Sequence, residues 1–361
     1  MNAPHVEEFL TLTEIVAAAK RNLPPGPWAY LMGGTESETT VKRNRHALDS
    51  LGFRPRILRD MSRIDASRDV FGKSMRLPVF LAPIGGLESI ADGGAAAAAR
   101  AAARFGIAQM LSSVCKPGLE ETAAAADNMK FFQLYVRGDR AWVDDFIRRA
   151  KDNGYRAFCY TVDVAMYSRR ERDILGRFTK PWRADAAAGH KFQSALSWDE
   201  IKRFKDRDPA FPVIVKGIAT AEDAQIAVEH GVDVVYVSNH GGRQLDHGMG
   251  SAAVLPEVLS SVKGKARVWV DGGFMRGTDV VKAIALGAEA VGLGRLCGLG
   301  LAAGGVAGLV RTLEILEDEV RICLGLLGAR SFAELTPRHV AAAPAVTLPD
   351  TFSAFPHLEL P

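Results

Sequence analysis

The chain has 361 residues, of which 48% are hydrophobic and 24% charged, and its formal net charge is +3. This ordinary globular composition excludes a disordered chain, a collagen-like repeat and a strongly basic nucleic-acid-binding tail. The mildly basic balance is compatible with a small anionic substrate.

Residues 1–78 are predicted to form an N-terminal helical segment and a lead-in to the main domain. Thr11 with Glu14 has the pattern of a capping box, which marks the start of a first helix. A second short helical segment ends at Gly33, and a polar, basic one covers residues 36–48. The residues before Thr11 contain no basic stretch followed by an apolar run, so we expect no secretory signal.

From residue 79 onward, short apolar runs alternate with Ala-rich or amphipathic segments of crossover-helix length. Runs that are apolar on both faces are typical of buried parallel strands. Eight such units predict one α/β domain over residues 1–361, a (β/α)8 TIM barrel; a doubly wound open sheet is the alternative, but six strands suffice for that fold. The runs are residues 79–82, 108–111, 131–135, 157–162, 213–216, 234–237, 268–270 and 290–293.

The interval after the fourth of these strands is much longer than the others. Residues 169–192 within it are polar, basic and rich in Gly and Ala. We interpret residues 164–200 as an inserted loop over the barrel mouth that acts as a mobile lid, with a plain surface excursion as the alternative.

The longest apolar stretch, residues 296–310, is shorter than the roughly 20 residues of a membrane span and contains several glycines, so we expect a buried helix. The four cysteines are scattered without a CxxC pair, which favours free thiols over disulfides or metal ligation. We therefore expect a cytoplasmic protein with no metal site, no membrane span and no nucleic-acid partner.

Polar residues occur where the apolar runs stop, on six of the eight predicted strands. In a (β/α)8 barrel the working residues lie at these carboxyl ends, so together they predict one site at the barrel mouth. The residues are Gln133, Tyr135, Thr161, Asp163, Lys216, Ser238–Asn239–His240, Asp271–Gly272–Gly273 and Gly294–Arg295.

The ends of the last two strands indicate a phosphate-bearing cofactor. Glycines there let backbone N–H groups approach an anion closely, and Arg295 adds a forked cation. Lys216 ends an otherwise apolar strand, and an unpaired buried charge is costly. A Schiff-base lysine, a cation beside a flavin and a structural ion pair all remain compatible with Lys216.

The segment Ser238–Asp246 has the densest chemistry in the chain. It places His240 three residues before Arg243 on a glycine-rich turn. Histidine can accept a proton near neutral pH, and arginine binds a carboxylate through two parallel hydrogen bonds. The pair suits an anionic substrate that loses a proton at its α-carbon or α-hydroxyl group.

This segment resembles the active-site motif of the FMN-dependent L-2-hydroxy acid oxidases and dehydrogenases, which include glycolate oxidase, lactate oxidase and mandelate dehydrogenase. The resemblance extends from about Leu12 to His339. The other matching stretches are Phe53–Arg56, Phe132–Tyr135, Thr161–Asp163, Val215–Gly217, Asp271–Gly273, Gly277–Asp279 and Ala285–Ala288.

The resemblance implies a catalytic role for four residues. His240 would be the base that removes a substrate proton while electrons pass to flavin N5, by either a hydride or a carbanion route. Asp163 would support the imidazolium, and Lys216 would lie near flavin N1. Tyr135 would bind and assist the substrate together with Tyr30, Arg170 and Arg243, of which the two arginines would hold its carboxylate.

The resemblance also implies an FMN site made from many strand ends. The isoalloxazine ring would be lined by Ala82, Pro83, Ile84, Ser112, Gln133, Thr161, Lys216 and Ser238. Asp271 would bind the ribityl chain, and Gly272, Gly273, Gly294 and Arg295 would take the phosphate.

Some positions depart from the family. A basic residue usually stands where this chain has Met275, so that either FMN binds more weakly or Arg276 substitutes. Val114 stands where glycolate-type enzymes place Trp, which predicts room for a bulkier substrate side chain. Gly85 replaces the Ala of many strict oxidases, and Ile84 replaces a hydroxyl residue.

The predicted function is FMN-dependent oxidation of an L-2-hydroxy acid to the 2-keto acid, with oxygen, a quinone or a cytochrome as electron acceptor. One alternative is a family enzyme with an altered substrate, either an amine or a bulky or aromatic hydroxy acid. Another is a non-catalytic flavin-binding paralogue. The resemblance also implies a homo-oligomer, with tetramers common among relatives.

Overall fold

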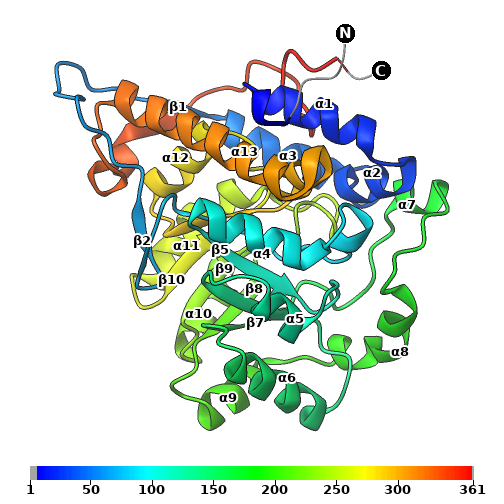
Figure 1. The fold of residues 1–361 in the computed structure, drawn as a ribbon. Coiled ribbons are helices and arrows are strands. Elements are labelled where there is room, and N and C mark those ends of the chain that lie inside the picture. The colour runs from blue at the N-terminus through cyan, green and yellow to red at the C-terminus, as the bar shows by residue number, and fades with distance from the viewer. Residues whose placement is uncertain (1–5, 360–361) are drawn as a thin grey trace.

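The computed structural model describes residues 6–359, apart from the side chains at positions 7 and 184–188. Eight strands close into a barrel in the order β10-β11-β4-β5-β6-β7-β8-β9, and every neighbouring pair is parallel (Figure 1). The predicted (β/α)8 barrel is thus confirmed and the open sheet is not. The strands are β4 (Val79–Leu81), β5 (Ala108–Ser112), β6 (Lys130–Leu134), β7 (Phe158–Thr161), β8 (Val213–Ile218), β9 (Val234–Val237), β10 (Arg267–Val270) and β11 (Ala290–Leu293).

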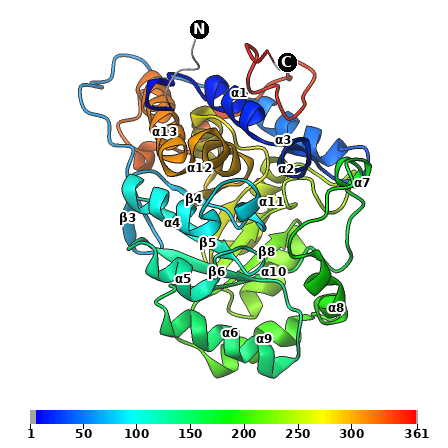
Figure 2. The same ribbon diagram turned by 45° about the vertical axis from the view of Figure 1, so that its right-hand side comes forward.

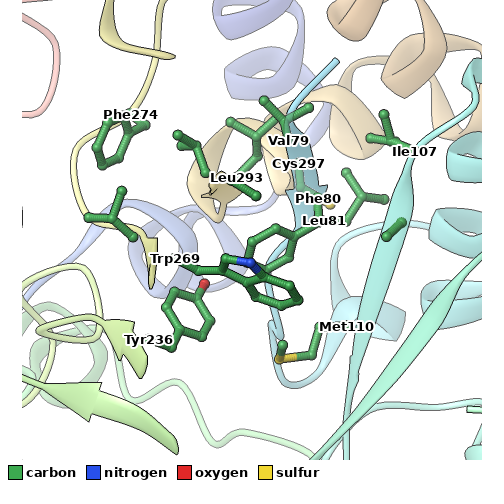
Figure 3. Packing of buried hydrophobic residues seen from close by; sticks show 14 of the residues in the cluster. Val79, Phe80, Leu81, Ile107, Met110, Tyr236, Trp269, Phe274, Leu293 and Cys297 are labelled. Atoms are coloured by element: carbon green, nitrogen blue, oxygen red, sulfur yellow. The ribbon is translucent and has the colours of Figure 1, made fainter. Parts of the chain in front are cut away.

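The barrel interior is a packed aromatic core. The rings of Phe80 on β4 and Trp269 on β10 have centroids 4.7 Å apart, and Tyr236 on β9 lies 5.5 Å from Phe80 (Figure 3). Their strands are apolar because both faces are covered, one by this core and the other by helices. In this fold the polar residues of a functional site are therefore expected at the carboxyl ends of the strands.

Helices follow the strands around the barrel. The last of them, α13, has non-helical backbone at Gly304 and Gly305. Among the described residues it is the one helix whose length and composition would suit a membrane span, but 67% of its most apolar window is buried within the fold, which favours the predicted core helix. The barrel helices are α4 (Gly94–Phe105), α5 (Leu119–Ala124), α6 (Arg140–Asp152), α9 (Trp198–Arg207), α10 (Ala221–Glu229), α11 (Ser251–Val262), α12 (Gly277–Leu286) and α13 (Arg295–Leu327).

The N-terminal segment folds over one side of the barrel as three helices, α1 (Leu12–Asn22), α2 (Pro25–Met32) and α3 (Thr39–Asp49) (Figure 2). The predicted capping box of Thr11 and Glu14 begins α1, which packs along α13. The short strands β1 (Leu51–Phe53) and β12 (Val340–Ala342) pair antiparallel, which links the segment after α3 to the C-terminal part of the chain. The remaining elements are β2 (Arg68–Val70), β3 (Lys73–Met75), η1 (Val6–Glu8), η2 (Leu87–Ser89), η3 (Phe332–Glu334) and η4 (Pro337–His339).

The predicted insertion after β7 is present, and it contains two helices that were not predicted, α7 (Glu171–Leu175) and α8 (Arg183–Ser194). Tertiary contacts explain the difference. The buried pair of Lys180 and Asp173, at 2.7 Å, closes the turn after α7. Gln193 at the end of α8 accepts from the backbone of Val136 at 2.7 Å and donates to the Thr161 carbonyl at 2.8 Å. The motion of the insertion as a lid stays a prediction, and so does the treatment of residues 1–361 as one domain. Residues 1–5 and 360–361 of that predicted domain lie outside the described part of the chain.

Candidate active site

A large cavity opens at the carboxyl ends of the barrel strands. It has about 1210 Å³ of empty space, including its open mouth. Its walls come from the ends of β4, β6, β8, β9, β10 and β11, from α2 and from the insertion. The predicted site residues that line it are Tyr30, Ala82, Pro83, Ile84, Tyr135, Arg170, Lys216, His240, Arg243, Asp271, Gly272, Gly273, Gly294 and Arg295.

His240 lies just beyond β9, with its imidazole held at both nitrogens. Nδ1 lies 3.1 Å from Oδ1 of Asp163, and Nε2 lies 3.1 Å from the hydroxyl of Tyr135. Because a carboxylate only accepts hydrogen bonds, Nδ1 carries the proton and Nε2 keeps its lone pair toward the cavity. This is the tautomer that a general base requires.

Burial and neighbouring charges adjust the protonation of this pair. Burial lowers the pKa of His240 below its usual 6.5, and Lys216 adds to the effect, whereas Asp163 opposes it. Burial alone would raise the pKa of Asp163, but the charges of His240 and Lys216 outweigh burial and lower it. Around neutral pH the pair therefore consists of a neutral imidazole beside a carboxylate, ready to stabilise the imidazolium.

Two guanidinium groups meet on another wall of the cavity. Nη1 of Arg243 donates to the carbonyls of Tyr30 at 2.6 Å and Gly33 at 2.8 Å, at the end of α2. Nε of Arg170 donates to the Arg243 carbonyl at 3.2 Å. Neither forms an ion pair with a carboxylate whose side chain the structure describes, and burial followed by Arg170 lowers the pKa of Arg243 to about 10. Arg243 remains cationic at neutral pH, so this wall of the cavity is suited to bind an anion.

Two tyrosines complete this side of the cavity. The hydroxyl of Tyr30 donates to the Gly85 carbonyl at 2.9 Å, and that of Tyr135 contacts His240. Burial raises the pKa of both phenols. They are therefore protonated donors, although Tyr30 must share or give up its bond to Gly85 to reach a substrate.

Lys216 belongs to a buried polar cluster at the ends of β8, β9 and β10. Its ammonium lies 2.9 Å from Oγ of Ser238 and 3.7 Å from a carboxylate oxygen of Asp271. Burial lowers the pKa of Lys216, but Asp271 and Asp163 outweigh it and raise the pKa. A permanently charged lysine cannot readily form a Schiff base, which needs the neutral amine. The geometry favours a fixed cation at the cavity wall.

The residues present fit FMN. Gln133 and Thr161, on the ends of β6 and β7, have buried polar side-chain atoms with no hydrogen-bond partner in the described part of the chain. Both amide atoms of Gln133 are among them. A side-chain amide with free donor and acceptor suits the mixed edge of a flavin pyrimidine ring. Four predicted flavin-binding residues are buried at strand ends and do not line the cavity: Ser112, Gln133, Thr161 and Ser238.

The phosphate end of the predicted site is a glycine cradle with one cation. Gly272 and Gly273 have φ of +104° and +87°, and a Cβ added to Gly294 at the start of α13 would meet no atom within 4 Å. Arg295 uses one N–H each on the carbonyls of Met32, Gly33 and Gly241, and two of its five donors remain. Backbone N–H groups and Arg295 could together hold a phosphate.

Arg276, the expected substitute at the phosphate, points elsewhere. Its guanidinium pairs with Glu319 on α13 at 2.6 Å and lies over the ring of Phe355. It is the N-cap residue of α12, and its side chain is directed toward α13 instead of the cavity. The prediction for Arg276 is therefore corrected, and Met275, which does line the cavity, has no cationic replacement there among the described residues.

The sequence analysis placed the insertion over the barrel mouth but missed three aromatic side chains that it contributes to the cavity. Tyr167, Trp182 and His190 line the cavity, and the rings of Tyr167 and His190 lie 4.8 Å apart. The aromatic residues within an otherwise basic, Ala-rich segment were the available signal. Only the fold shows that the insertion brings them over the barrel mouth.

Comparison with known proteins decides the family. The family model described as FMN-dependent dehydrogenase matches residues 19–342. Glycolate oxidase 1 of Zea mays is 38% identical over 97% of this chain and 99% of its own length, and glycolate oxidase of Spinacia oleracea is 37% identical over 93% and 96%. A crystal structure of mandelate oxidase superimposes with a TM-score of 0.88 at 35% identity, covering 94% of this chain and all of that one.

The chain belongs to the FMN-dependent dehydrogenase family. As a member of that family it is an FMN-dependent oxidoreductase that oxidises 2-hydroxy acids. The predicted cofactor and reaction class are thus confirmed. The roles assigned to single residues rest on the geometry above.

Proposed function

We propose that the protein oxidises an L-2-hydroxy acid with a bulky or aromatic side chain, with His240 as the base. The observation that supports this most directly is the convergence in one cavity of a neutral, oriented imidazole and two guanidinium groups that pair with no described carboxylate side chain. FMN, when bound, supplies the two-electron acceptor for the substrate α-carbon. Its place is at the strand ends, where Lys216, Gln133 and the glycine cradle lie.

The protein residues divide the work. Arg170 and Arg243 bind the substrate carboxylate through their forked guanidinium groups. The bound carboxylate in turn fixes the position of the substrate α-carbon. Nε2 of His240 takes the substrate proton, and Asp163 stabilises the resulting imidazolium through Nδ1. Tyr135, whose hydroxyl contacts Nε2, donates to the substrate oxygen once the substrate is seated. Lys216 presents a permanent positive charge where negative charge develops.

Anaerobic mixing of purified, FMN-loaded protein with a panel of L-2-hydroxy acids tests the proposal. We expect the yellow flavin absorbance to bleach with at least one of them, and faster with mandelate than with glycolate. Bleaching by amines alone would favour the altered-substrate alternative. A yellow protein that neither compound class bleaches would favour the non-catalytic paralogue.

The substrate class is supported by the apolar part of the cavity. Val114, Val136, Val164 and Trp182 line it next to Gly85. Val114 stands where glycolate-type enzymes place Trp, and its smaller side chain leaves open volume for the side chain of a substrate. A mandelate oxidase variant that also superimposes, with a TM-score of 0.87, was crystallised with (S)-mandelic acid, an aromatic 2-hydroxy acid.

Replacing Val114 with Trp is expected to lower kcat/KM for mandelate by roughly tenfold to a hundredfold, because the indole fills the space for the phenyl group. The value for glycolate should change much less, since glycolate has no side chain. Steady-state kinetics on both substrates measures the ratio. Val346→Trp, at a position that is 97% exposed, is the control. Equal losses on the two substrates would contradict the assignment of Val114 to the side-chain wall.

The pH dependence of kcat/KM should show the pKa of His240. Because burial lowers this pKa below 6.5 and the base must be unprotonated, activity is expected to be level near pH 7 and to fall on the acid side, with a midpoint below pH 6.5. Asp163→Asn removes the charge that raises the pKa, so the acid limb should move to still lower pH while the maximal rate falls. An acid limb centred above pH 7 would contradict this account.

The electron acceptor, the compartment and the assembly stay predictions. We propose oxygen, a quinone or a cytochrome as acceptor, a cytoplasmic location and a homo-oligomer, possibilities that family resemblance and the scattered cysteines support. Reoxidation rates of the reduced protein with each acceptor class test the electron acceptor. Light scattering in solution tests the oligomeric state.

A further inference from the structure

The loop that carries His240 has an unfavourable backbone. His240, Gly241 and Gly242 have consecutive φ values of +58°, +66° and +76°. A non-glycine residue in this left-handed region is strained, and such a conformation persists only where surrounding contacts hold it. The position of the base thus depends on the anchors of the loop.

The immediate anchor is Asn239, the residue before His240. Its Oδ1 accepts from the backbone N–H of Gly242 at 3.1 Å and so closes the turn around His240. Its Nδ2 donates to the Met249 carbonyl at 2.9 Å. The amide of Asn239 therefore links both sides of the loop.

A second amide from the N-terminal segment completes this anchor. Asn44 on α3 is 1% exposed and donates from Nδ2 to Oδ1 of Asn239 at 2.9 Å, while its own Oδ1 accepts from Nδ2 of Asn239 at 2.7 Å. The same oxygen accepts from the backbone N–H of Ser251, at the start of α11, at 3.0 Å. Asn44 thus pairs reciprocally with Asn239 and satisfies the first turn of the next helix.

Asn44 also packs against the loop that follows β10. A Cβ added to Gly272 would come within 3.0 Å of Oδ1 of Asn44, and one added to Gly273 would come within 3.1 Å of Cβ of Asn44. The two loops that carry the base and the glycine cradle therefore share one buried contact. Arg45, the next residue on α3, donates to the Gly273 carbonyl at 3.1 Å and forms an ion pair with Asp279 at 2.7 Å, which holds α3 in place.

We propose that Asn44 is a positioning residue that sets the location of His240 through Asn239, so that the N-terminal helix α3 is part of the catalytic apparatus. The proposal rests on the function proposed above. Arg243, four residues beyond Asn239, has its own anchors in the carbonyls of α2. Loss of Asn44 should therefore displace the base more than the carboxylate site.

Two variants of the FMN-loaded enzyme test this. Asn44→Leu removes the whole amide pair, and a displacement of the base by about 1 Å can lower the rate about a hundredfold. Asn44→Asp keeps the acceptor for Ser251 and Asn239 but loses the donor to Oδ1 of Asn239, so we expect a smaller loss of about tenfold. Both losses should be in the rate of anaerobic flavin reduction at saturating substrate, with KM little changed.

Asn22→Ala is the matched control. Asn22, an exposed residue at the end of α1, donates to the carbonyls of Ala302 and Ala303 on α13. Its replacement therefore removes an N-terminal anchor that does not line the cavity. We expect it to lower the thermal unfolding temperature and to leave the reduction rate unchanged. Hydrogen exchange of residues 238–250, measured by mass spectrometry, should accelerate in both Asn44 variants and not in Asn22→Ala.

The exchange measurement separates this proposal from the proposed function. A wild-type protein that no hydroxy acid reduces would reject the function, whereas exchange would still report whether Asn44 holds the loop. Wild-type reduction rates and wild-type exchange in Asn44→Asp and Asn44→Leu would overturn the positioning role. A rate loss in Asn22→Ala as large as that in Asn44→Asp would overturn it too, and if Asn44→Leu fails to fold, Asn44→Asp decides.

Discussion

Replacing His240 with Asn is expected to lower the rate of substrate-driven flavin reduction by about 10²–10⁴-fold, the usual contribution of a positioned general base. Asn suits the site because it tolerates the left-handed backbone that His240 adopts, at φ +58°. FMN should remain bound, since the predicted cofactor contacts come from other residues. Stopped-flow reduction under anaerobic conditions, with the FMN content measured from absorbance, gives both quantities.

The matched control is His230→Asn. His230 caps the end of α10, where Nδ1 lies 2.9 Å from the Ile226 carbonyl, and it does not line the cavity. Its replacement should leave the reduction rate unchanged. A His240→Asn protein that is isolated without FMN would show that His240 has a structural role, and one that is reduced at the wild-type rate would exclude His240 as the base.

Replacing Arg243 with Lys is expected to raise KM for the hydroxy acid by about tenfold to a hundredfold, as follows from the loss of a hydrogen bond between charged groups. Nη1 of Arg243 is held by the carbonyls of α2, which leaves Nε and Nη2 for a carboxylate. A lysine keeps the charge but cannot be anchored and bind two oxygens at once. The dependence of the reduction rate on substrate concentration measures the effect.

Arg172→Lys serves as the control for this substitution. Arg172 lies on α7 in the insertion, where its half-exposed guanidinium pairs with Glu38. The conservative replacement there should change neither KM nor the reduction rate. An unchanged KM in Arg243→Lys would remove Arg243 from the carboxylate site, and an equal rise in Arg172→Lys would assign the effect to the overall charge of the insertion.

The barrel and most of the strand-end residues could be predicted because their signal is local. Each strand is a short apolar run that stops at a polar residue, and parallel strands in a closed barrel must bring those ends to one rim. His240, Asp163 and Lys216 therefore meet although they are far apart in the sequence.

The failures have the opposite origin. The insertion over residues 164–200 contains α7 and α8, and Gln193 of α8 is hydrogen-bonded to the backbone of Val136 and Thr161 at the barrel. The family resemblance offered Arg276 as a substitute at the phosphate, but its side chain pairs with Glu319 on α13 instead. In both cases the deciding partner lies on an element distant in the chain.

The order of residues alone thus determined the barrel, the rim that carries the chemistry, and the family with its flavin and hydroxy acid chemistry. Only the tertiary structure decided the tautomer of His240, the free donors of the two guanidinium groups, the direction of Arg276 and the pairing of Asn44 with Asn239. The physical reason is range. Periodicity and turn residues act over a few positions, whereas burial, hydrogen-bond partners and charge neighbours are set by whichever distant segments the closed barrel brings together.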